Sequence, residues 1–370
     1  MSPAAGAAGA PERVLVRGPN WLGDLVMATP AFRALRAGLP RAHLTLQLRE
    51  GLEPLLAGAP WFDAVETLEG GGLRARWREA RRLRRRRFDL ALCLPDSWSA
   101  ALRLRAVGAR RLVGHGRHAR GLLLDLALPL PRAVGGRVLL PRERHALGLV
   151  EALGCPARGT ALELHVTEAE EARAARALAE AGLDPGLPLA TLAPGASYGP
   201  AKLWPAAGFA RVADALAAAG ARIALVGAAR EAPLVARVAR AMRAPAADLA
   251  GRLDLGALKA LLRRSSLLVC NDAGARHVAV ALGTPCVMLL GPTSLAKTSL
   301  NLERVRVLVH DVGCRPCYHR VCPVDHRCMR GLAPERVIES ALAAWRGRAP
   351  RSAPSGTVPA TAPIDYPAGP

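Results

Sequence analysis

The sequence has few aromatic side chains, fewer acidic than basic ones, and no long apolar run. Aromatic residues make up only 4% of the chain, so aliphatic side chains must fill any core. The longest apolar stretch, Val278–Leu290, has 13 residues and includes Gly283 and Pro285, whereas a membrane-spanning helix needs about 20. The first 11 residues lack the basic start and apolar block of a secretory signal. We therefore expect a cytoplasmic protein with a flexible leader.

The composition is typical of a globular chain with two domains. Its 370 residues correspond to two domains at ~150 residues each. Hydrophobic residues make up 51% and charged residues 22%, which excludes a collagen-like or wholly disordered chain. The 51 Lys and Arg residues against 30 Asp and Glu residues give a net charge of +21, which favours acidic partners.

Short apolar segments alternate with helix-length amphipathic segments in both halves of the chain. Strands are predicted at 13–17, 43–48, 88–94, 109–113, 189–192, 222–226, 267–270 and 286–290. Helices are predicted at 25–37, 168–181, 206–219, 231–242 and 273–282. Strands separated by helices indicate βαβ units and parallel sheets. The expected fold is therefore α/β, with two Rossmann-like doubly wound lobes whose strand-end loops face a central cleft.

The best boundary between the two lobes is the segment 183–189, which contains Pro185, Gly186 and Pro188. The expected divisions are a leader at 1–11, an N-terminal lobe at 12–182, a C-terminal lobe at 183–346 and a disordered tail at 347–370.

The loop Gly18–Asp24, GPNWLGD, follows the first predicted strand and begins a helix. Its glycines permit close backbone approach, and a helix N-terminus favours an anion. Asp24 is the only carboxylate between Glu12 and Glu50, and an aspartate in a crevice can take a proton from an attacking hydroxyl. Alternatively, Asp24 only caps the helix or complements its start with negative charge. The loop matches neither the dinucleotide fingerprint nor the P-loop.

Three further segments at strand ends carry groups that suit a phosphorylated sugar. The Gly- and Pro-rich loop 193–205 could hold a diphosphate through its amides, Ser197 and Lys202, or be a surface turn with a solvated lysine. In 270–277, Asp272, Gly274 and His277 could contact a ligand, or be a helix cap and a buried histidine. Glu231 could bind ribose hydroxyls, or only begin a helix.

Two features have several possible roles. Four cysteines, Cys314, Cys317, Cys322 and Cys328, could hold a structural zinc ion, but the spacing lacks the paired CxxC form, so reduced or loop-stapling cysteines are favoured. The run 74–87 has nine arginines against one glutamate. It could form a helix with Leu73, Trp77 and Leu83 on its apolar side, contacting anionic lipid, phosphorylated saccharide, nucleic acid or only solvent.

Taken together, four segments resemble the ADP-heptose:lipopolysaccharide heptosyltransferases of glycosyltransferase family 9. The segments are RGPNWLGDLVMATPAFRALR (17–36), PGASYGPAKLWP (194–205), NDAGARHVAVALGTPCVMLLGPT (271–293) and CRPCYHRVCPVDHRCM (314–329). The resemblance runs from about Val14 to Trp345 and implies the GT-B architecture, with the sugar nucleotide mainly in the C-terminal lobe. It also implies an inverting, metal-independent glycosyltransferase without a cofactor.

The resemblance implies a role for each candidate residue. Asp24 matches the general base, which deprotonates a heptose hydroxyl of the lipopolysaccharide inner core, and its neighbours Asn20, Trp21 and Gly23 form the acceptor-side loop. The residues expected to bind the donor are Ser197, Tyr198 and Lys202 at the diphosphate, Glu231 at the ribose, Leu253 near the adenine, and Asp272, Ala273, Gly274 and His277 around the heptose.

The implied partners are ADP-heptose, the lipid A-core oligosaccharide and the anionic surface of the inner membrane on its cytoplasmic face. The chain departs from the family at Ala273, where Ser or Thr is usual, and at Lys297, where Arg is more common. Both departures concern donor specificity more than the type of reaction. Alternatives are a GT-B enzyme that uses another sugar nucleotide and, less favoured, a nucleic-acid-binding protein, which would not explain why Asp24, Lys202 and Asp272 all follow strands.

Overall fold

The computed structural model describes residues 10–68, 70–117, 119–130, 140–184 and 187–347. Nearly all of the expected leader (1–11) and tail (347–370) lies outside these ranges. The described residues form two compact units, of which the first comprises the chain up to Glu53 and Ala59–Thr160, and the second comprises Pro54–Gly58 and the chain from Ala161 on. Each helix in these ranges falls short of the length and apolarity needed to cross a bilayer.

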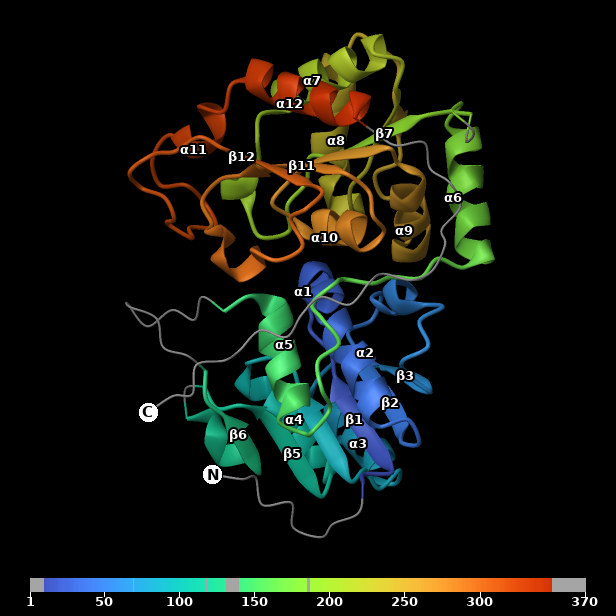
Figure 1. Ribbon diagram of the computed structural model, residues 1–370, viewed down its shortest axis with the longest axis vertical. Helices are drawn as coiled ribbons and strands as arrows, with labels where there is room; N and C mark the ends of the chain where they lie inside the picture. Colours follow the sequence, from blue (N-terminus) through green and yellow to red (C-terminus); the bar gives the residue numbers. More distant parts are fainter. Residues whose placement is uncertain (1–9, 69, 118, 131–139, 185–186, 348–370) are drawn as a thin grey trace. The chain divides into compact units, whose positions relative to one another are not determined.

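The first unit contains a six-stranded parallel sheet with the order β3-β2-β1-β4-β5-β6 (Figure 1). Its strands are β1 (Arg13–Arg17), β2 (His43–Leu48), β3 (Ala64–Thr67), β4 (Leu90–Cys93), β5 (Arg111–His115) and β6 (Leu126–Leu128). Strand β1 pairs with both β2 and β4, so the strand order reverses between β1 and β4. Ligands of such open sheets bind at the carboxyl ends of the strands beside the reversal.

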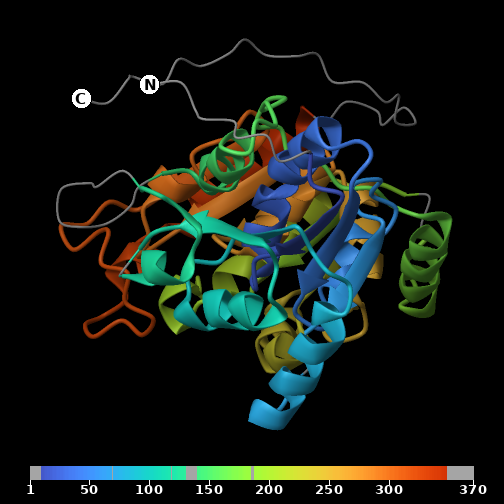
Figure 2. The same cartoon turned by 90° about the horizontal axis from the view of Figure 1, so that it is seen from below.

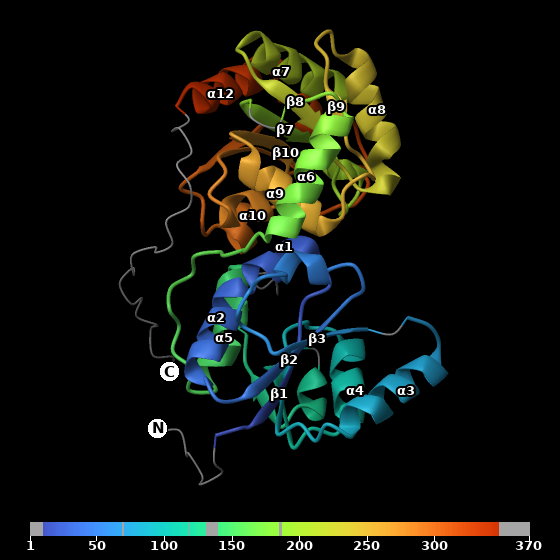
Figure 3. The same ribbon diagram turned by 90° about the vertical axis from the view of Figure 1, so that its right-hand side faces the viewer.

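Helices cover both faces of this sheet (Figure 3). One face carries α1 (Leu22–Met27), α2 (Thr29–Gly38) and α5 (Arg142–Glu151), and the other carries α3 (Leu73–Arg84) and α4 (Trp98–Val107). The single helix predicted at 25–37 is wrong, because the chain breaks at Ala28 and begins α2 with Pro30 in its first turn. Proline is tolerated there since the missing N–H would have no partner within the helix.

The second unit repeats the design with the order β12-β11-β10-β7-β8-β9. Its strands are β7 (Leu189–Ala193), β8 (Arg222–Leu225), β9 (Ala247–Asp248), β10 (Leu267–Asn271), β11 (Cys286–Leu290) and β12 (Val305–Val309). Strand β7 pairs in parallel with both β8 and β10, so the reversal in this sheet lies between β7 and β10. The two parallel sheets confirm the predicted α/β fold class.

The helices of the second unit also form two layers (Figures 1 and 3). They are α7 (Ala206–Ala218), α8 (Ala232–Ala241) and α12 (Pro334–Arg346) on one face, α9 (Leu255–Arg264) and α10 (Gly274–Ala281) on the other, α6 (Glu168–Glu180) against α9, and the short α11 (Arg327–Arg330). Aliphatic side chains dominate the core between the sheet and α7, and the buried Trp204, Phe209 and Trp345 complete it.

Helix α6 belongs to the second unit, although it precedes the expected boundary at 183. A capping box of Thr167 and Glu170 closes its N-terminus. Glu170 also pairs with Lys259 of α9 at 3.1 Å, with both side chains buried. The same Lys259 ammonium donates to the carbonyl oxygens of Pro54 and Ala57, each at 3.1 Å. These contacts place both α6 and the segment Pro54–Gly58 with α9.

Helix α3, drawn in light blue, extends away from the first sheet (Figure 2). Of Leu73, Trp77 and Leu83, which were expected on the apolar side of such a helix, Leu83 is buried, whereas Leu73 and Trp77 are 82% and 63% exposed. Only the C-terminal half of the helix packs, through Ala80, Leu83 and the buried Glu79. Its N-terminal half therefore presents Leu73 and Trp77 among arginines.

Candidate active site

The loops after β1 and β4 form a pocket in the first unit, at the reversal of the strand order. This cavity has a volume of about 360 Å³. It is lined by Pro19, Asn20, Trp21, Asp24 and Ala28 on the β1 side, by Leu94, Pro95, Asp96 and Ser97 on the β4 side, and by Arg117, Arg142, His145 and Ala146. Two carboxylates, two guanidinium groups and an imidazole thus surround one polar cavity.

Asp24 lies in the first turn of α1 and faces this pocket. Its carboxylate is 3.8 Å from Nε of Arg142, and each of the two side chains is about one-third exposed. The N-cap of α1 is Trp21, which makes no side-chain capping bond, so Asp24 is not the helix cap, but its place in the first turn agrees with the alternative that its charge complements the helix start. A carboxylate with one long ion pair remains accessible to a ligand in the cavity.

The other predicted acceptor-side residues surround Asp24. The buried Arg17 guanidinium donates to the side chain of Asn20 and to the carbonyl oxygen of Gln47, and burial lowers the pKa of Arg17 to about 10. Trp21 is half-exposed and lines the cavity, while Gly23 lies within α1. The loop is therefore anchored at Asn20 and open at Trp21.

Asp96 and His145 line the same pocket, and neither was predicted from the sequence. Nε2 of His145 is 3.1 Å from Oδ2 of Asp96. Burial disfavours the charged form of Asp96, but the hydrogen bond from His145 and the nearby Arg120 outweigh it and hold the pKa of Asp96 below its ordinary value. Asp96 could have been found because it follows β4 as Asp24 follows β1, whereas no pattern marked His145 within its helix.

Lys202 and Asp272 meet in the second unit, at the reversal between β7 and β10. Nζ of Lys202 lies 2.5 Å from Oδ2 of Asp272, and each side chain is 11% exposed. The hydroxyl of Thr293 donates to the same oxygen at 2.7 Å. Burial disfavours the ionised carboxyl, but Lys202 outweighs this effect and lowers the pKa of Asp272. Lys202 is therefore not the solvated lysine of a surface turn.

Contacts from β10 fix the loop that carries Lys202. The side chain of Asn271 donates to the carbonyl oxygen of Pro194 at 2.7 Å and accepts from the amide of Trp204 at 3.2 Å. The Tyr198 ring lies 4.9 Å from Nζ of Lys202, and Ser197 accepts a hydrogen bond from Arg230. Ser197, Tyr198 and Lys202, which are predicted to contact a diphosphate, thus lie on one anchored loop.

Glu231 lies beside this loop. Its carboxylate accepts the amide of Ala228 at 2.9 Å, which agrees with its alternative role at a helix start. It also lies so close to Gly195 that a Cβ there would come within 2.3 Å of the carboxylate carbon, so a larger residue at position 195 would displace the Glu231 carboxylate. Leu253, expected near an adenine, is half-buried on the turn before α9.

The remaining donor-site candidates lie at the start of α10. Ala273 is the N-cap and offers no side-chain capping bond, and Gly274 is the first helical residue. His277 is buried, and burial together with the adjacent Arg276 lowers its pKa well below the ordinary value. The neutral imidazole of His277 and the uncapped amides of α10 therefore lie close to Asp272, in a region suited to an anion.

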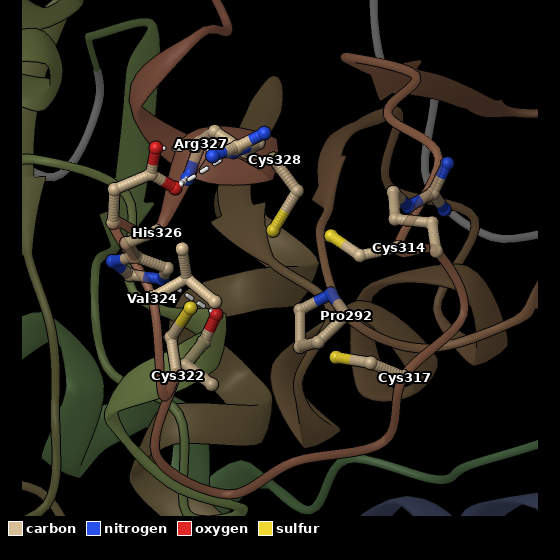
Figure 4. A pocket seen from close by; sticks show the side chains of 11 residues that line it. Pro292, Cys314, Cys317, Cys322, Val324, His326, Arg327 and Cys328 are labelled. Carbon is tan, nitrogen blue, oxygen red and sulfur yellow. Dashed lines mark hydrogen bonds and ion pairs between the residues drawn. The ribbon is translucent and has the colours of Figure 1, made fainter.

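The four clustered cysteines line a cavity of about 140 Å³ with Pro292, His326 and Arg327 (Figure 4). All eight cysteines are free thiols, so the loop-stapling alternative is wrong. Burial and the neighbouring thiols raise the pKa of Cys328. Among the described residues no three His, Cys, Asp or Glu side chains are arranged to hold a metal ion.

The segment that carries these cysteines packs on the loops that carry Lys202 and Thr293. Nε of Arg315 donates to the carbonyl oxygen of Gly291 at 2.6 Å, next to the loop of Thr293. Nε2 of His326 lies 2.7 Å from the carbonyl oxygen of Ala201, next to Lys202. The cysteine segment therefore holds in place the two loops whose side chains meet at Asp272.

Comparisons with known proteins identify relatives that match most of this chain. Lipopolysaccharide heptosyltransferase 2 of Escherichia coli strain K12 is 29% identical over 349 residues, which cover 88% of this chain and 97% of that protein. The enzyme of the same name from Salmonella typhimurium is 30% identical with the same coverage. The solved structure of E. coli ADP-heptose lps heptosyltransferase II matches with a TM-score of 0.76 and 26% identity, over 90% of this chain and 98% of that one.

A family model supplies the assignment. The model described as glycosyltransferase family 9 (heptosyltransferase) matches residues 76–327, which is more than half of the chain. The matched region includes Lys202, Asp272 and most of the cysteine segment. The chain therefore belongs to glycosyltransferase family 9, the heptosyltransferases, and is a glycosyltransferase with the GT-B fold.

Proposed function

We propose that the protein transfers heptose from ADP-L-glycero-D-manno-heptose to a heptose of the lipopolysaccharide inner core, as a heptosyltransferase II. The observation that carries this proposal is the Lys202–Asp272–Thr293 cluster at the reversal of the second sheet. A buried cation next to uncapped helix amides suits a diphosphate, and Asp272 offers a carboxylate to sugar hydroxyls. The relatives that match along nearly their whole length are named lipopolysaccharide heptosyltransferase 2.

The reaction is a single displacement with inversion at the anomeric carbon. Asp24 takes the proton from the acceptor hydroxyl, whose oxygen forms a bond to the anomeric carbon of the donor heptose. The bond from that carbon to the diphosphate oxygen breaks, and ADP leaves with the electron pair. Because ADP is a good leaving group, no second carboxylate is needed to protonate it. The mechanism therefore requires a single base, Asp24 of the first unit.

Residues of the second unit hold the donor. Lys202 offsets the charge that builds on the leaving diphosphate, so the proposal requires no metal ion. Ser197 and Tyr198 contact the diphosphate and Glu231 contacts the ribose. The other residues assigned to the donor are Leu253 at the adenine, and Asp272, Ala273, Gly274 and His277 at the heptose.

The proposal is tested by incubating the protein with ADP-heptose and a heptose-bearing core acceptor and measuring ADP release. Asp24→Asn should retain ADP-heptose binding and lose turnover by about 10²–10⁴-fold, the range for a general base. Full activity of this variant would remove Asp24 from the mechanism. Ser99→Ala, on the exposed face of α4 outside the pocket, is the control.

A second candidate is a family 9 enzyme that takes another sugar nucleotide. The alanine at position 273 favours this alternative, because it lacks the hydroxyl with which a serine or threonine there would contact the donor. Comparison of ADP-heptose, ADP-glucose and UDP-glucose as donors distinguishes the two, because only the proposed function requires ADP-heptose to have the highest kcat/KM.

We also propose that the protein attaches peripherally to the anionic inner-membrane surface on its cytoplasmic face, where the lipid A-core acceptor is anchored. The support is the exposed half of α3, in which Leu73 and Trp77 lie among arginines, with the Arg81 guanidinium 5.1 Å from the centre of the Trp77 ring. Apolar and cationic side chains on one short helix suit the boundary between lipid headgroups and acyl chains. Nucleic acid is not an expected partner.

A further inference from the structure

The acceptor pocket contains a second carboxylate besides the proposed base. Asp96 follows β4 and Asp24 follows β1, and these two strands are neighbours at the reversal of the sheet. Both side chains line the same cavity. The single-displacement mechanism uses only Asp24, so the presence of Asp96 in the pocket calls for another explanation.

The two carboxylate oxygens of Asp96 have different surroundings. Oδ2 lies 3.1 Å from Nε2 of His145. Oδ1 is buried and has no hydrogen bond from the described residues, with its nearest cation, Nη2 of Arg120, at 3.7 Å. Oδ1 is therefore shielded from the cavity and lies against the buried Arg120. The Asp96 side chain is still 19% exposed, and Oδ2 keeps a second lone pair besides the one that accepts from His145, so a ligand hydroxyl in the cavity would donate to Oδ2.

His145 is held firmly behind Asp96. It is 5% exposed, and its ring centre is 4.1 Å from that of His115. Nε2 of His115 lies 2.8 Å from the carbonyl oxygen of His145, which ties the backbone of α5 to the end of β5. His145 is thus fixed from its ring and its backbone, and it in turn fixes the carboxylate of Asp96.

A purely structural role accounts for only part of this arrangement. Arg120 is fully buried and also donates to the carbonyl oxygens of Pro95 and His115. These bonds already hold the loop in place, so a structural role does not explain why Asp96 lines the cavity. The pocket also holds Arg117 and Arg142, which place two cations beside the two carboxylates. An ionised, oriented carboxylate in a polar pocket suits hydroxyl groups of a saccharide.

We infer that Asp96 is an acceptor-binding residue: its carboxylate accepts a hydrogen bond from an acceptor-saccharide hydroxyl other than the one that attacks, and His145 positions it. The inference rests on the proposed function in taking the acceptor to be a saccharide. Asp24 and Asp96 then have different roles in one pocket. Asp24 removes the proton from the attacking hydroxyl, and Asp96 orients the sugar ring that carries this hydroxyl.

The test compares Asp96→Ala, Asp96→Asn and His145→Phe with wild type in acceptor titrations at saturating ADP-heptose. Loss of a hydrogen bond to a charged group should raise the acceptor KM about 10–100-fold in Asp96→Ala. Asp96→Asn should recover part of this loss because its amide oxygen still accepts one hydrogen bond, and His145→Phe should raise KM less. ADP affinity should not change, since the donor residues lie in the other unit.

Glu151→Ala, a carboxylate truncation on the same helix as His145 but outside the pocket, is the matched control. An acceptor KM for Asp96→Ala within twofold of wild type, in an active and folded protein, overturns the inference. Binding of a heptose-bearing core oligosaccharide, followed by ligand-observed NMR without donor, gives a readout independent of turnover. If wild type transfers no heptose, the proposed function fails, and equal oligosaccharide binding by wild type and Asp96→Ala then also overturns the inference.

Discussion

Lys259 carries a buried ammonium group that contacts two other segments of the chain. It pairs with Glu170 and donates to three backbone carbonyls of residues 54–57, with no part of its side chain exposed. Burial lowers the pKa of Lys259, and the hydrogen bond from its ammonium to Glu170 opposes this. The residue therefore joins three separate chain segments at a site without access to water.

Replacing Lys259 by methionine should destabilise the second unit by about 3–5 kcal/mol, because Glu170 would remain as a buried unpaired charge. Urea unfolding followed by circular dichroism measures this loss. The double variant with Glu170→Gln, which removes the charge and keeps the capping geometry, should recover part of it. Equal stability of the single and double variants would show that the charge of Glu170 is not the cause.

The buried His115 should make the stability of the folded protein depend on pH. Burial, followed by repulsion from His145, lowers the pKa of His115 to about 4, whereas a histidine in an unfolded chain titrates near 6.5. Asp96 and Arg120 also face the ring and act in opposite directions. Between these two pH values the unfolded chain binds a proton that the folded chain does not, so stability falls as the pH falls.

The expected contribution of His115 is a loss on the order of 3 kcal/mol of unfolding free energy between pH 6.5 and pH 4. His115→Gln has no such titration, so its unfolding free energy should fall less steeply across this window. Urea unfolding at half-unit pH steps provides the measurement. Parallel curves for wild type and variant would contradict the assigned protonation.

At the level of elements, α10 begins without a side-chain cap, because alanine occupies position 273. Ala273→Ser should supply one and raise the unfolding free energy by about 1 kcal/mol. Ala236→Ser within α8 is the control, and it should lower stability slightly because serine has the lower helix propensity. A lower melting temperature for Ala273→Ser would show that the backbone at Ala273 cannot form the capping bond.

The elements also show how far sequence patterns reach. The strands at 13–17, 43–48 and 286–290 lie where they are predicted, because each is a run of mostly apolar residues between polar turns. Strands β3, β6, β9 and β12 were not predicted, because they are only two to five residues long and partly buried. Such edge strands form because a neighbouring strand offers hydrogen bonds, and this information is not local to the sequence.

The residues of the candidate site also fall into those that could be predicted from the sequence and those that could not. Residues in loops directly after predicted strands, such as Asp24, Lys202 and Asp272, could be found because parallel strands bring their carboxyl ends to one edge. The contact between Lys202 and Asp272 joins residues 70 positions apart and needed the sheet order. His145 lies within a helix of ordinary pattern, and only its contact with Asp96 marks it.

For the molecule as a whole, the net charge of +21 and the exposed part of α3 predict binding to anionic vesicles that weakens with salt. The double variant Arg74→Glu and Arg81→Glu should lower the bound fraction at least tenfold in vesicle sedimentation, since each basic residue at the surface contributes about 1 kcal/mol. Arg237→Glu with Arg240→Glu, exposed on α8, is the charge-matched control. Equal loss in both variants would show attraction without a preferred face.

The two sheets share one strand order, and this makes the halves of the chain comparable position by position. The turn after the opening strand bears Asp24 in one half and Lys202 in the other, and the turn after the fourth strand bears Asp96 and Asp272 respectively. The positions after the opening strands thus carry opposite charges, whereas the positions after the fourth strands both carry an aspartate. A substitution at one of these strand ends can therefore be compared directly with a substitution at the equivalent strand end of the other sheet.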